Sequence, residues 1–181
     1  MKRQARGGSR GRRSRRRPDD DDLNNEVMEI RRVAKVVKGG KNLSFRVLMA
    51  VGDGKGQVGL GKGNTREIPR AIQQGIRDAK RRMIHVPLKE GTIPHQIIGE
   101  YKAARVVLRP AFPGTGIIAG NTVGLLCRLA GVQDILTKSL GSTNPITLAK
   151  ATLEGFKQLR TVEQVARLRD KTQQEILHVE T

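Results

Sequence analysis

The chain has 181 residues, with 35 Lys and Arg against 17 Asp and Glu and a formal net charge of +18. This excess of positive charge points to a polyanionic partner, of which nucleic acid is the default. The single cysteine excludes an internal disulfide, the three histidines form no metal-ligand cluster, and no apolar run reaches the roughly 18 residues of a membrane span. We therefore expect a soluble, intracellular protein, not bound to a membrane, that needs neither metal nor cofactor.

The first 25 residues combine Arg, Gly and Ser with four successive carboxylates, Asp19 to Asp22. Nine of the first 17 residues are basic, yet the remaining chain still carries a net charge of +9. Since residues 1–25 have little to bury, we expect a disordered tail on a folded part that is itself basic. An Arg-rich start also occurs in organelle transit peptides, and the acidic run could bind a divalent ion; a solvated arm is the simpler interpretation.

A β-meander is predicted next. Residues Val27 to Val37 and Leu43 to Val51 carry β-branched side chains in an extended pattern, and Lys38-Gly39-Gly40-Lys41 forms the turn between them. A second turn, Gly52 to Gly56, leads into a short glycine-rich strand, Gln57 to Gly61. The pattern predicts three antiparallel strands.

Helical spacing then replaces strand spacing. At roughly 100° per residue, one face about 80° wide is apolar and consists of Ile68, Ile72, Ile76, Ala79 and Met83. A second face, about 60° wide and nearly opposite, consists of Arg66, Arg70, Arg77 and Arg81, which we call the arginine face. Asn64 or Thr65 is expected to cap the helix, and Pro69 suits its first turn. Acidic partners are nearly absent, so we expect the arginine face to bind phosphates; a merely solvated face is the alternative.

A polar link, Lys89-Glu90-Gly91, predicts a boundary between a domain at residues 26–88 and a second at 92–160. The second domain is expected to be ββαβα, with strands at 93–101, 104–108 and 135–140 and a helix at 118–130. Its last helix should start at Asn144 as N-cap with Pro145 in the first turn, and bury Ile146, Ala149, Leu153 and Phe156. A weaker helix over 162–177 belongs to an extension at 161–181. The fold class is therefore α+β.

Two glycine motifs invite a nucleotide-binding interpretation. Residues Gly54 to Gly59 match G-x-G-x-x-G but lie in a hairpin, where a dinucleotide fingerprint does not occur. Gly114 to Ala119 precede the predicted helix with Asp134 about 20 residues on, which keeps a nucleotide-dependent enzyme as an alternative. The domain is too short for a doubly wound sheet, whereas bare glycine amides at a helix start suit any phosphate. No catalytic set is indicated, and Cys127 fits a small core position.

Several motifs taken together resemble the ribosomal protein S5 family of the bacterial small subunit. They are Lys35 to Lys41 (KVVKGGK), Val51 to Gly56 (VGDGKG), Gly114 to Gly116 (GTG), Ala119-Gly120 and Gly141 to Pro145 (GSTNP). The resemblance runs from about Val27 to Leu159. It implies a first domain similar to double-stranded-RNA-binding modules (βββα) and a two-layer second domain with a left-handed crossover, shared with small-molecule kinases but without their activity.

The resemblance also implies a structural, non-enzymatic role in the cytoplasmic ribosome. Such a protein binds small-subunit ribosomal RNA, contacts small-subunit proteins four and eight, lies near protein three and the channel through which messenger RNA enters, and influences decoding accuracy. The turn at Lys38 to Lys41 corresponds to the family's loop near the spectinomycin site.

Candidate residues follow from the charge pattern and the resemblance. The candidate RNA-binding residues are Arg31, Lys38, Gly39, Gly40, Lys41, Arg46, Lys55, Lys62, Arg66, Arg70, Arg77, Lys80, Arg81, Arg82, Arg105, Gly114, Thr115 and Gly116. Candidate protein contacts are Gly120, Gly124 and Arg128. Many relatives carry an arginine where this chain has Gly124, so the contact with protein four is expected to differ here.

Overall fold

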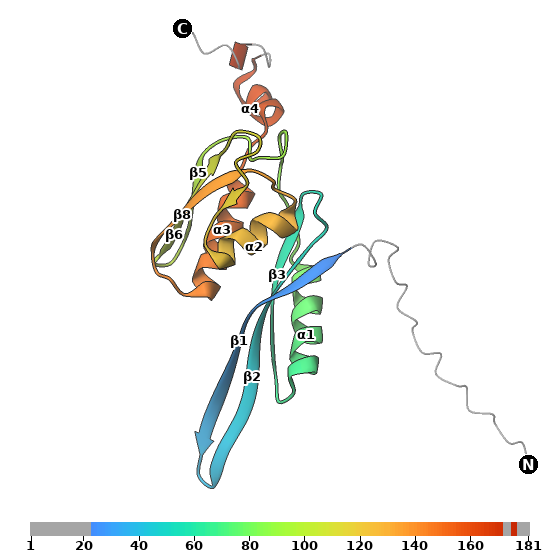
Figure 1. Cartoon of the computed structure of the whole chain (residues 1–181), viewed down its shortest axis with the longest axis vertical. Coiled ribbons are helices and arrows are strands. Elements are labelled where there is room, and N and C mark those ends of the chain that lie inside the picture. The colour runs from blue at the N-terminus through green and yellow to red at the C-terminus, as the bar shows by residue number, and fades with distance from the viewer. Residues whose placement is uncertain (1–22, 172–174, 177–181) are drawn as a thin grey trace, which may run out of the picture.

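The computed structural model describes residues 23–171 and 175–176. Along the chain it contains a four-stranded sheet with one helix, then a second four-stranded sheet with two helices, so the predicted α+β class is confirmed (Figure 1). The expected disordered tail lies outside the described residues, apart from its last three. Asn24 and Asn25, which the prediction put in that tail, are the first residues of β1.

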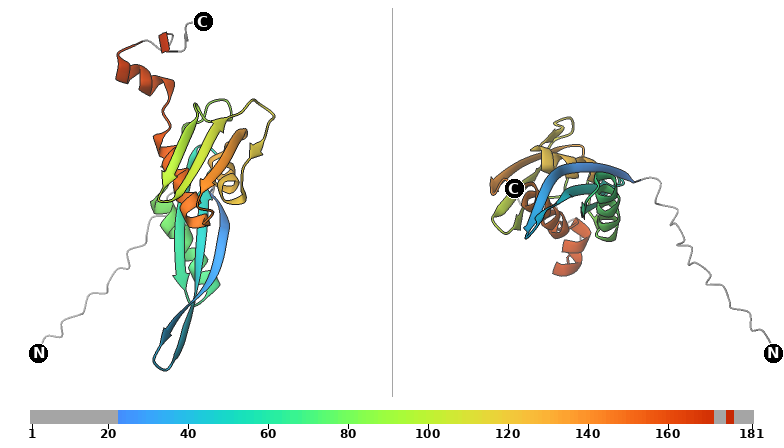
Figure 2. Two further views of the ribbon diagram at one scale, coloured as in Figure 1. Left: turned by 90° about the vertical axis from the view of Figure 1, so that its left-hand side faces the viewer. Right: turned by 90° about the horizontal axis from the view of Figure 1, so that it is seen from below.

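The first sheet is the predicted antiparallel meander with one added strand. Its order is β1 (Asn24–Val37), β2 (Gly40–Gly52), β3 (Gln57–Thr65) and β4 (Ile84–His85). The first two strands form a long hairpin that projects past the rest of the domain (Figures 1 and 2). Strand β3 is longer than predicted because its glycines hide the strand pattern, and the two-residue β4 was not predicted.

Helix α1 (Ile68–Arg81) packs on β2 and β3 with a face that includes Ala79 as predicted but is turned toward Ala71 and Gly75. Its buried residues are Ala71, Gly75 and Ala79, whereas Ile72 and Ile76 are only partly buried at the side, against Val47 and Met49. The reason is the facing strand: glycines in β3 bring the backbones so close that only small residues fit between them.

The N-terminal cap of α1 also differs from the prediction. Glu67 occupies the N-cap position without a side-chain hydrogen bond, and Pro69 lies in the first turn as expected. Thr65 donates its hydroxyl hydrogen to the carbonyl of Glu67, and Asn64 lies in β3 with its N–H bonded to Gln74. Neither caps the helix, because both belong to the end of the sheet.

The second sheet has the order β5 (Ile97–Tyr101), β6 (Ala104–Pro110), β8 (Ile135–Gly141) and β7 (Ile117–Ile118), with β7 parallel to β8 and the other pairs antiparallel. Helices α2 (Asn121–Ala130) and α3 (Pro145–Gln158) lie on its inner side (Figure 1). Two predictions were wrong here. Residues 93–96 are not strand, and residues 117–118 form β7 instead of starting the helix, since Gly120 is still extended and α2 begins after it.

The start of α3 is confirmed. The Asn144 side chain accepts the N–H of Ile146, and Pro145 is in the first turn. Ala149, Leu153 and Phe156 are buried and Ile146 is partly buried, as predicted. The following helix α4 (Val162–Arg169) begins with a capping box at Thr161 and Gln164 and ends at Asp170, in the left-handed conformation, so it is shorter than predicted.

One hydrophobic core connects the two sheets. Leu48, Val58 and Val86 of the first half belong to the same buried cluster as Leu126 and Phe156 of the second. The turn after β2 docks on the end of α2, where Gly54 donates to the carbonyl of Leu129 at 3.0 Å and Gly56 to that of Ala130 at 2.9 Å. A domain boundary near residues 89–91 stays a prediction, because this core crosses it.

Candidate nucleic-acid interface

Three members of the arginine face lie on the side of α1 turned away from the sheet, and the fourth, Arg66, lies just before the helix. Small residues hold the opposite side of the helix against β3, and the four arginines are exposed: Arg66, Arg70, Arg77 and Arg81. Because α1 is fixed on the sheet along its whole length, the face is presented as one rigid row of guanidinium groups. Planar guanidinium groups bind phosphate through paired hydrogen bonds.

Carboxylates pair with some cations of α1, which the sequence did not indicate. Arg70 Nε lies 2.9 Å from Glu67 and Arg82 lies 3.1 Å from Asp78. Both pairs are largely exposed, so they contribute little to stability and can exchange for a phosphate. Within the part of the chain that is described, no ion pair involves Arg66, Arg77 or Arg81.

The β1–β2 hairpin carries a second basic group. Val37 pairs with Gly40, so Lys38 and Gly39 form the tip, and Gly39 has a φ of 99° that favours glycine. Lys38 and Lys41 are exposed there. Lower on the hairpin, Arg31 pairs with Arg46 across the strands and is itself bonded to Glu29 at 2.6 Å. The tip therefore presents lysines on an arm that projects from the body (Figure 2).

Other candidate residues lie apart from these two groups. Lys55 is exposed in the turn that docks on α2, where Asp53 already accepts the N–H groups of Lys55 and Gln57. The G-x-G-x-x-G motif at residues 54–59 therefore joins the two halves of the protein. Arg105 lies on the second sheet and pairs with Glu100 at 3.2 Å, away from α1.

The Gly114 to Gly116 loop is less suited to phosphate than its sequence indicated. It leads into β7 and does not open a helix. The buried carboxylate of Asp134 accepts the N–H of Gly116 at 2.7 Å, and Thr115 donates its N–H to Phe112 at 3.2 Å. Two of the three amides are thus occupied, and a carboxylate beside them repels an anion. The same hydrogen bond gives Asp134 a structural role, which removes the main support for a dinucleotide site.

The candidate protein contacts gather around α2. Gly120 and Arg128 are exposed, whereas Gly124 is buried. A Cβ added at Gly124 would lie 3.4 Å from the Cβ of Ala119. Gly124 itself is therefore not a surface contact. At that position the chain simply lacks a projecting side chain.

Sequence reasoning named Lys62 as a candidate but missed the polar residues that surround it where the two halves meet. Lys150 of α3 donates to the hydroxyl of Tyr101 at 2.9 Å, and Lys102 lies 6.0 Å from the tyrosine ring centre. Lys62 of β3 lies within electrostatic range of Lys150. These residues are distant in sequence and carry no motif, so only the fold brings them together.

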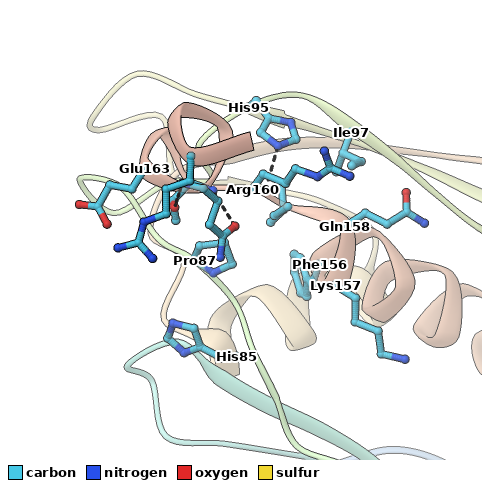
Figure 3. Close-up of a pocket in the computed structure, with 13 residues that line it drawn as sticks. His85, Pro87, His95, Ile97, Phe156, Lys157, Gln158, Arg160 and Glu163 are labelled. Atoms are coloured by element: carbon cyan, nitrogen blue, oxygen red, sulfur yellow. Dashed lines mark hydrogen bonds between the residues drawn. The ribbon is translucent and has the colours of Figure 1, made fainter. Parts of the chain in front are cut away.

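An open cavity of about 1220 Å³ lies between the end of α3, α4 and the segment that carries His95 (Figure 3). His95 Nε2 accepts the N–H of Arg160 at 3.1 Å, and its Nδ1 lies 3.0 Å from the carbonyl of Gln96. Both ring nitrogens are engaged with backbone groups, so His95 is a structural residue and not a general base. Among the described residues, no group of His, Cys, Asp and Glu could hold a metal ion.

These features define a basic protein whose exposed cations are concentrated on and beside α1 and on the β1–β2 hairpin. In the described part, no helix is long and apolar enough to span a membrane. Comparison with known proteins gives the family. Residues 23–87 match the family "Ribosomal protein S5, N-terminal domain" and residues 99–169 match "Ribosomal protein S5, C-terminal domain".

Relatives of similar length agree. The chain is similar to the small ribosomal subunit protein uS5 of Thermotoga neapolitana, at 56% identity over 86% of this chain and 88% of that protein. It is also similar to uS5 of Rhodopirellula baltica, at 55% identity over 81% and 83%, and of Rubrobacter xylanophilus, at 47% over 89% and 80%. The chain therefore belongs to the ribosomal protein S5 family, whose members are structural, non-enzymatic components of the small ribosomal subunit.

Proposed function

We propose that this protein binds small-subunit ribosomal RNA through the arginine face of α1 and the lysines at the hairpin tip, as a structural constituent of a cytoplasmic ribosome. The observation that carries the proposal is the arginine face, whose four exposed arginines lie on α1 and just before it and include three that lack an ion-pair partner among the described residues. Each phosphate contact releases counterions from the RNA, which favours binding at low salt. Candidates Arg31, Arg46, Lys80 and Arg82 extend this surface, and Arg105 is a separate candidate on the second sheet.

The neighbours in the particle are part of the same proposal. The exposed start of α2 at Gly120 and the side chain of Arg128 are offered as the contact with small-subunit protein four, and protein eight as a further neighbour. The hairpin tip is offered as the family's loop near the spectinomycin site, and the protein as a whole as one that borders the messenger entry channel near protein three and influences accuracy. Support for these points is the resemblance of the motifs and the exposure of these residues.

The test is the paired change Arg70→Glu and Arg77→Glu. Charge-assisted contacts are worth roughly 1.5–3 kcal/mol each, so loss of two of them should weaken binding to small-subunit ribosomal RNA by about 100-fold or more. For the wild type, six to nine phosphate contacts give a slope of log affinity against log salt of about −5 to −8, and the double variant should have a slope shallower by about 2.

The matched control is Arg167→Glu with Arg169→Glu on α4, which makes the same change in net charge at exposed positions away from α1. Its affinity should fall much less. Equal losses in both variants would mean that total charge, and not the arginine face, governs binding. Cosedimentation with small subunits through moderate salt tests the ribosomal assignment, and ATP-dependent turnover by the purified protein would contradict it.

A further inference from the structure

The junction between the two halves of the protein is rigid and gathers positive charge. Strand β3 of the first sheet and the end of β5 of the second are fixed relative to each other by the shared core and by the docked turn at Gly54 and Gly56. Side chains that meet across this junction therefore keep their positions in the free protein. A ligand that binds there meets preorganised groups.

Tyr101 is the centre of the group. It is partly buried at the end of β5, and Lys150 Nζ lies 2.9 Å from its hydroxyl and 4.5 Å from its ring centre. Since Lys150 is the donor in this bond, the tyrosine hydroxyl hydrogen is available to donate to an anion. The hydrogen bond from Lys150 also lowers the pKa of Tyr101, with burial acting in the opposite direction.

Lys62 adds a second ammonium group from the other half of the molecule. Burial lowers the pKa of Lys62, and the charge of Lys150 lowers it further, followed by Arg46 and Arg82. Asp78 accepts the backbone N–H of Lys62 at 3.0 Å but pairs its carboxylate with Arg82 at 3.1 Å, so within the described residues the Lys62 ammonium group has no ion-pair partner. The cations therefore repel one another in the free protein, and a bound anion would relieve the repulsion.

We propose that Lys62, Lys150 and the Tyr101 hydroxyl form a phosphate-binding site that clamps one backbone phosphate of ribosomal RNA at the junction of the two halves. Arg46 and Lys102 flank the site. The inference rests on the proposed function and extends it, because it places an RNA contact between the sheets in addition to the arginine face. Two ammonium groups and a hydroxyl supply donors from three elements, which matches the several oxygens of a phosphate.

The chain supplies its own reporter for this site, because Tyr101 is the only tyrosine and there is no tryptophan. Tyrosinate absorbance of the full chain is titrated with alkali, with and without inorganic pyrophosphate. An anion beside Tyr101 disfavours the tyrosinate, so pyrophosphate should raise the pKa of Tyr101. The rise should disappear in Lys62→Gln and persist in Lys138→Gln, which removes an exposed lysine from the second sheet. Lys150→Arg, which retains the positive charge, should also show the rise in the pKa of Tyr101.

A second measurement uses RNA. The pair Lys62→Gln and Lys150→Gln should weaken binding to small-subunit ribosomal RNA about ten-fold and make the salt slope shallower by about 1 to 2. The control pair Lys138→Gln and Lys171→Gln makes the same charge change at exposed positions, and its affinity for the RNA should fall much less.

The outcomes separate the two proposals. If the Arg70→Glu, Arg77→Glu variant loses affinity while the Lys62, Lys150 pair does not, the junction site is wrong and the proposed function stands. If wild-type protein ignores the RNA, the proposed function fails, and an RNA phosphate at the junction fails with it. If pyrophosphate raises the pKa of Tyr101 but the Lys62, Lys150 pair binds RNA as tightly as wild type, the site takes free phosphate only. That result would also overturn the proposed contact with an RNA phosphate. No response of Tyr101 in the wild type would rule out a phosphate at this position.

Discussion

Cys127 shows how burial sets the chemistry of a single residue. It is fully buried in α2, and desolvation of the thiolate raises the pKa of its thiol to about 12. A thiol held in this way neither attacks nor binds metal under ordinary conditions, because the thiolate is the reactive form. The interpretation of Cys127 as a core residue is therefore supported by its position.

The raised pKa predicts how stability depends on pH. The unfolded chain loses the Cys127 proton above about pH 8.5, while the folded protein keeps it up to about pH 12. The contribution of Cys127 is therefore fully present below the unfolded pKa and falls at higher pH by up to about 1.4 kcal/mol per pH unit. We expect the free energy of unfolding to fall more steeply with alkaline pH in wild type than in Cys127→Ala. Parallel curves for the two proteins would contradict the burial.

At the level of elements, the packing of α1 on β3 depends on small residues facing each other. A Cβ added at Gly61 would lie 2.0 Å from the carbonyl oxygen of Gly75, and one at Gly63 would lie 1.8 Å from that of Ala71. These contacts involve backbone atoms, which cannot rotate away. The approach of α1 therefore requires glycine in β3, and the arginine face is held in place by it.

Gly61→Ala tests this packing. We expect a loss of at least about 2 to 3 kcal/mol in the free energy of unfolding, because the helix must shift from the strand. Gly120→Ala is the matched control, since Gly120 has a negative φ and open space around it, and its stability should change by less than about 1 kcal/mol. Denaturant unfolding of both variants measures the difference; a Gly61→Ala protein as stable as wild type would show that α1 lies further from β3.

This packing also explains which elements the sequence could predict. The hairpin and the cap at Asn144 depend on local residues and were predicted correctly, although the turn is confined to Lys38 and Gly39 and the predicted turn residues Gly40 and Lys41 begin β2. The exact buried face of α1 depends on its partner strand, so the apolar spacing predicted Ala79 correctly but missed Ala71 and Gly75. Short strands such as β7 exist only through pairing with β8, and no local pattern marks them. Lys62 was predicted as a candidate from its charge, but its grouping with Tyr101 and Lys150 was missed for the same reason, since it requires the tertiary fold.

On the scale of the whole molecule, two glycines allow the halves to join. A Cβ at Gly52 would lie 2.2 Å from the carbonyl oxygen of Leu129, and Gly131, with a φ of 85°, approaches the carbonyl of Gly54 so closely that its Cβ would lie 2.1 Å away. With the shared core, this contact should make the described fold unfold as one unit, in spite of its two sheets.

Gly131→Ala tests whether the halves are coupled. The substitution introduces both a strained left-handed conformation and a clash with backbone, so we expect a loss of several kcal/mol. In wild type, amide hydrogen exchange of β2 and of α2 should then occur with similar opening free energies, because both depend on global unfolding. In Gly131→Ala the two should separate, with one half more protected than the other. Exchange that already differs between the halves in wild type would show that they open independently, and the site at their junction would then lose the rigidity on which it depends.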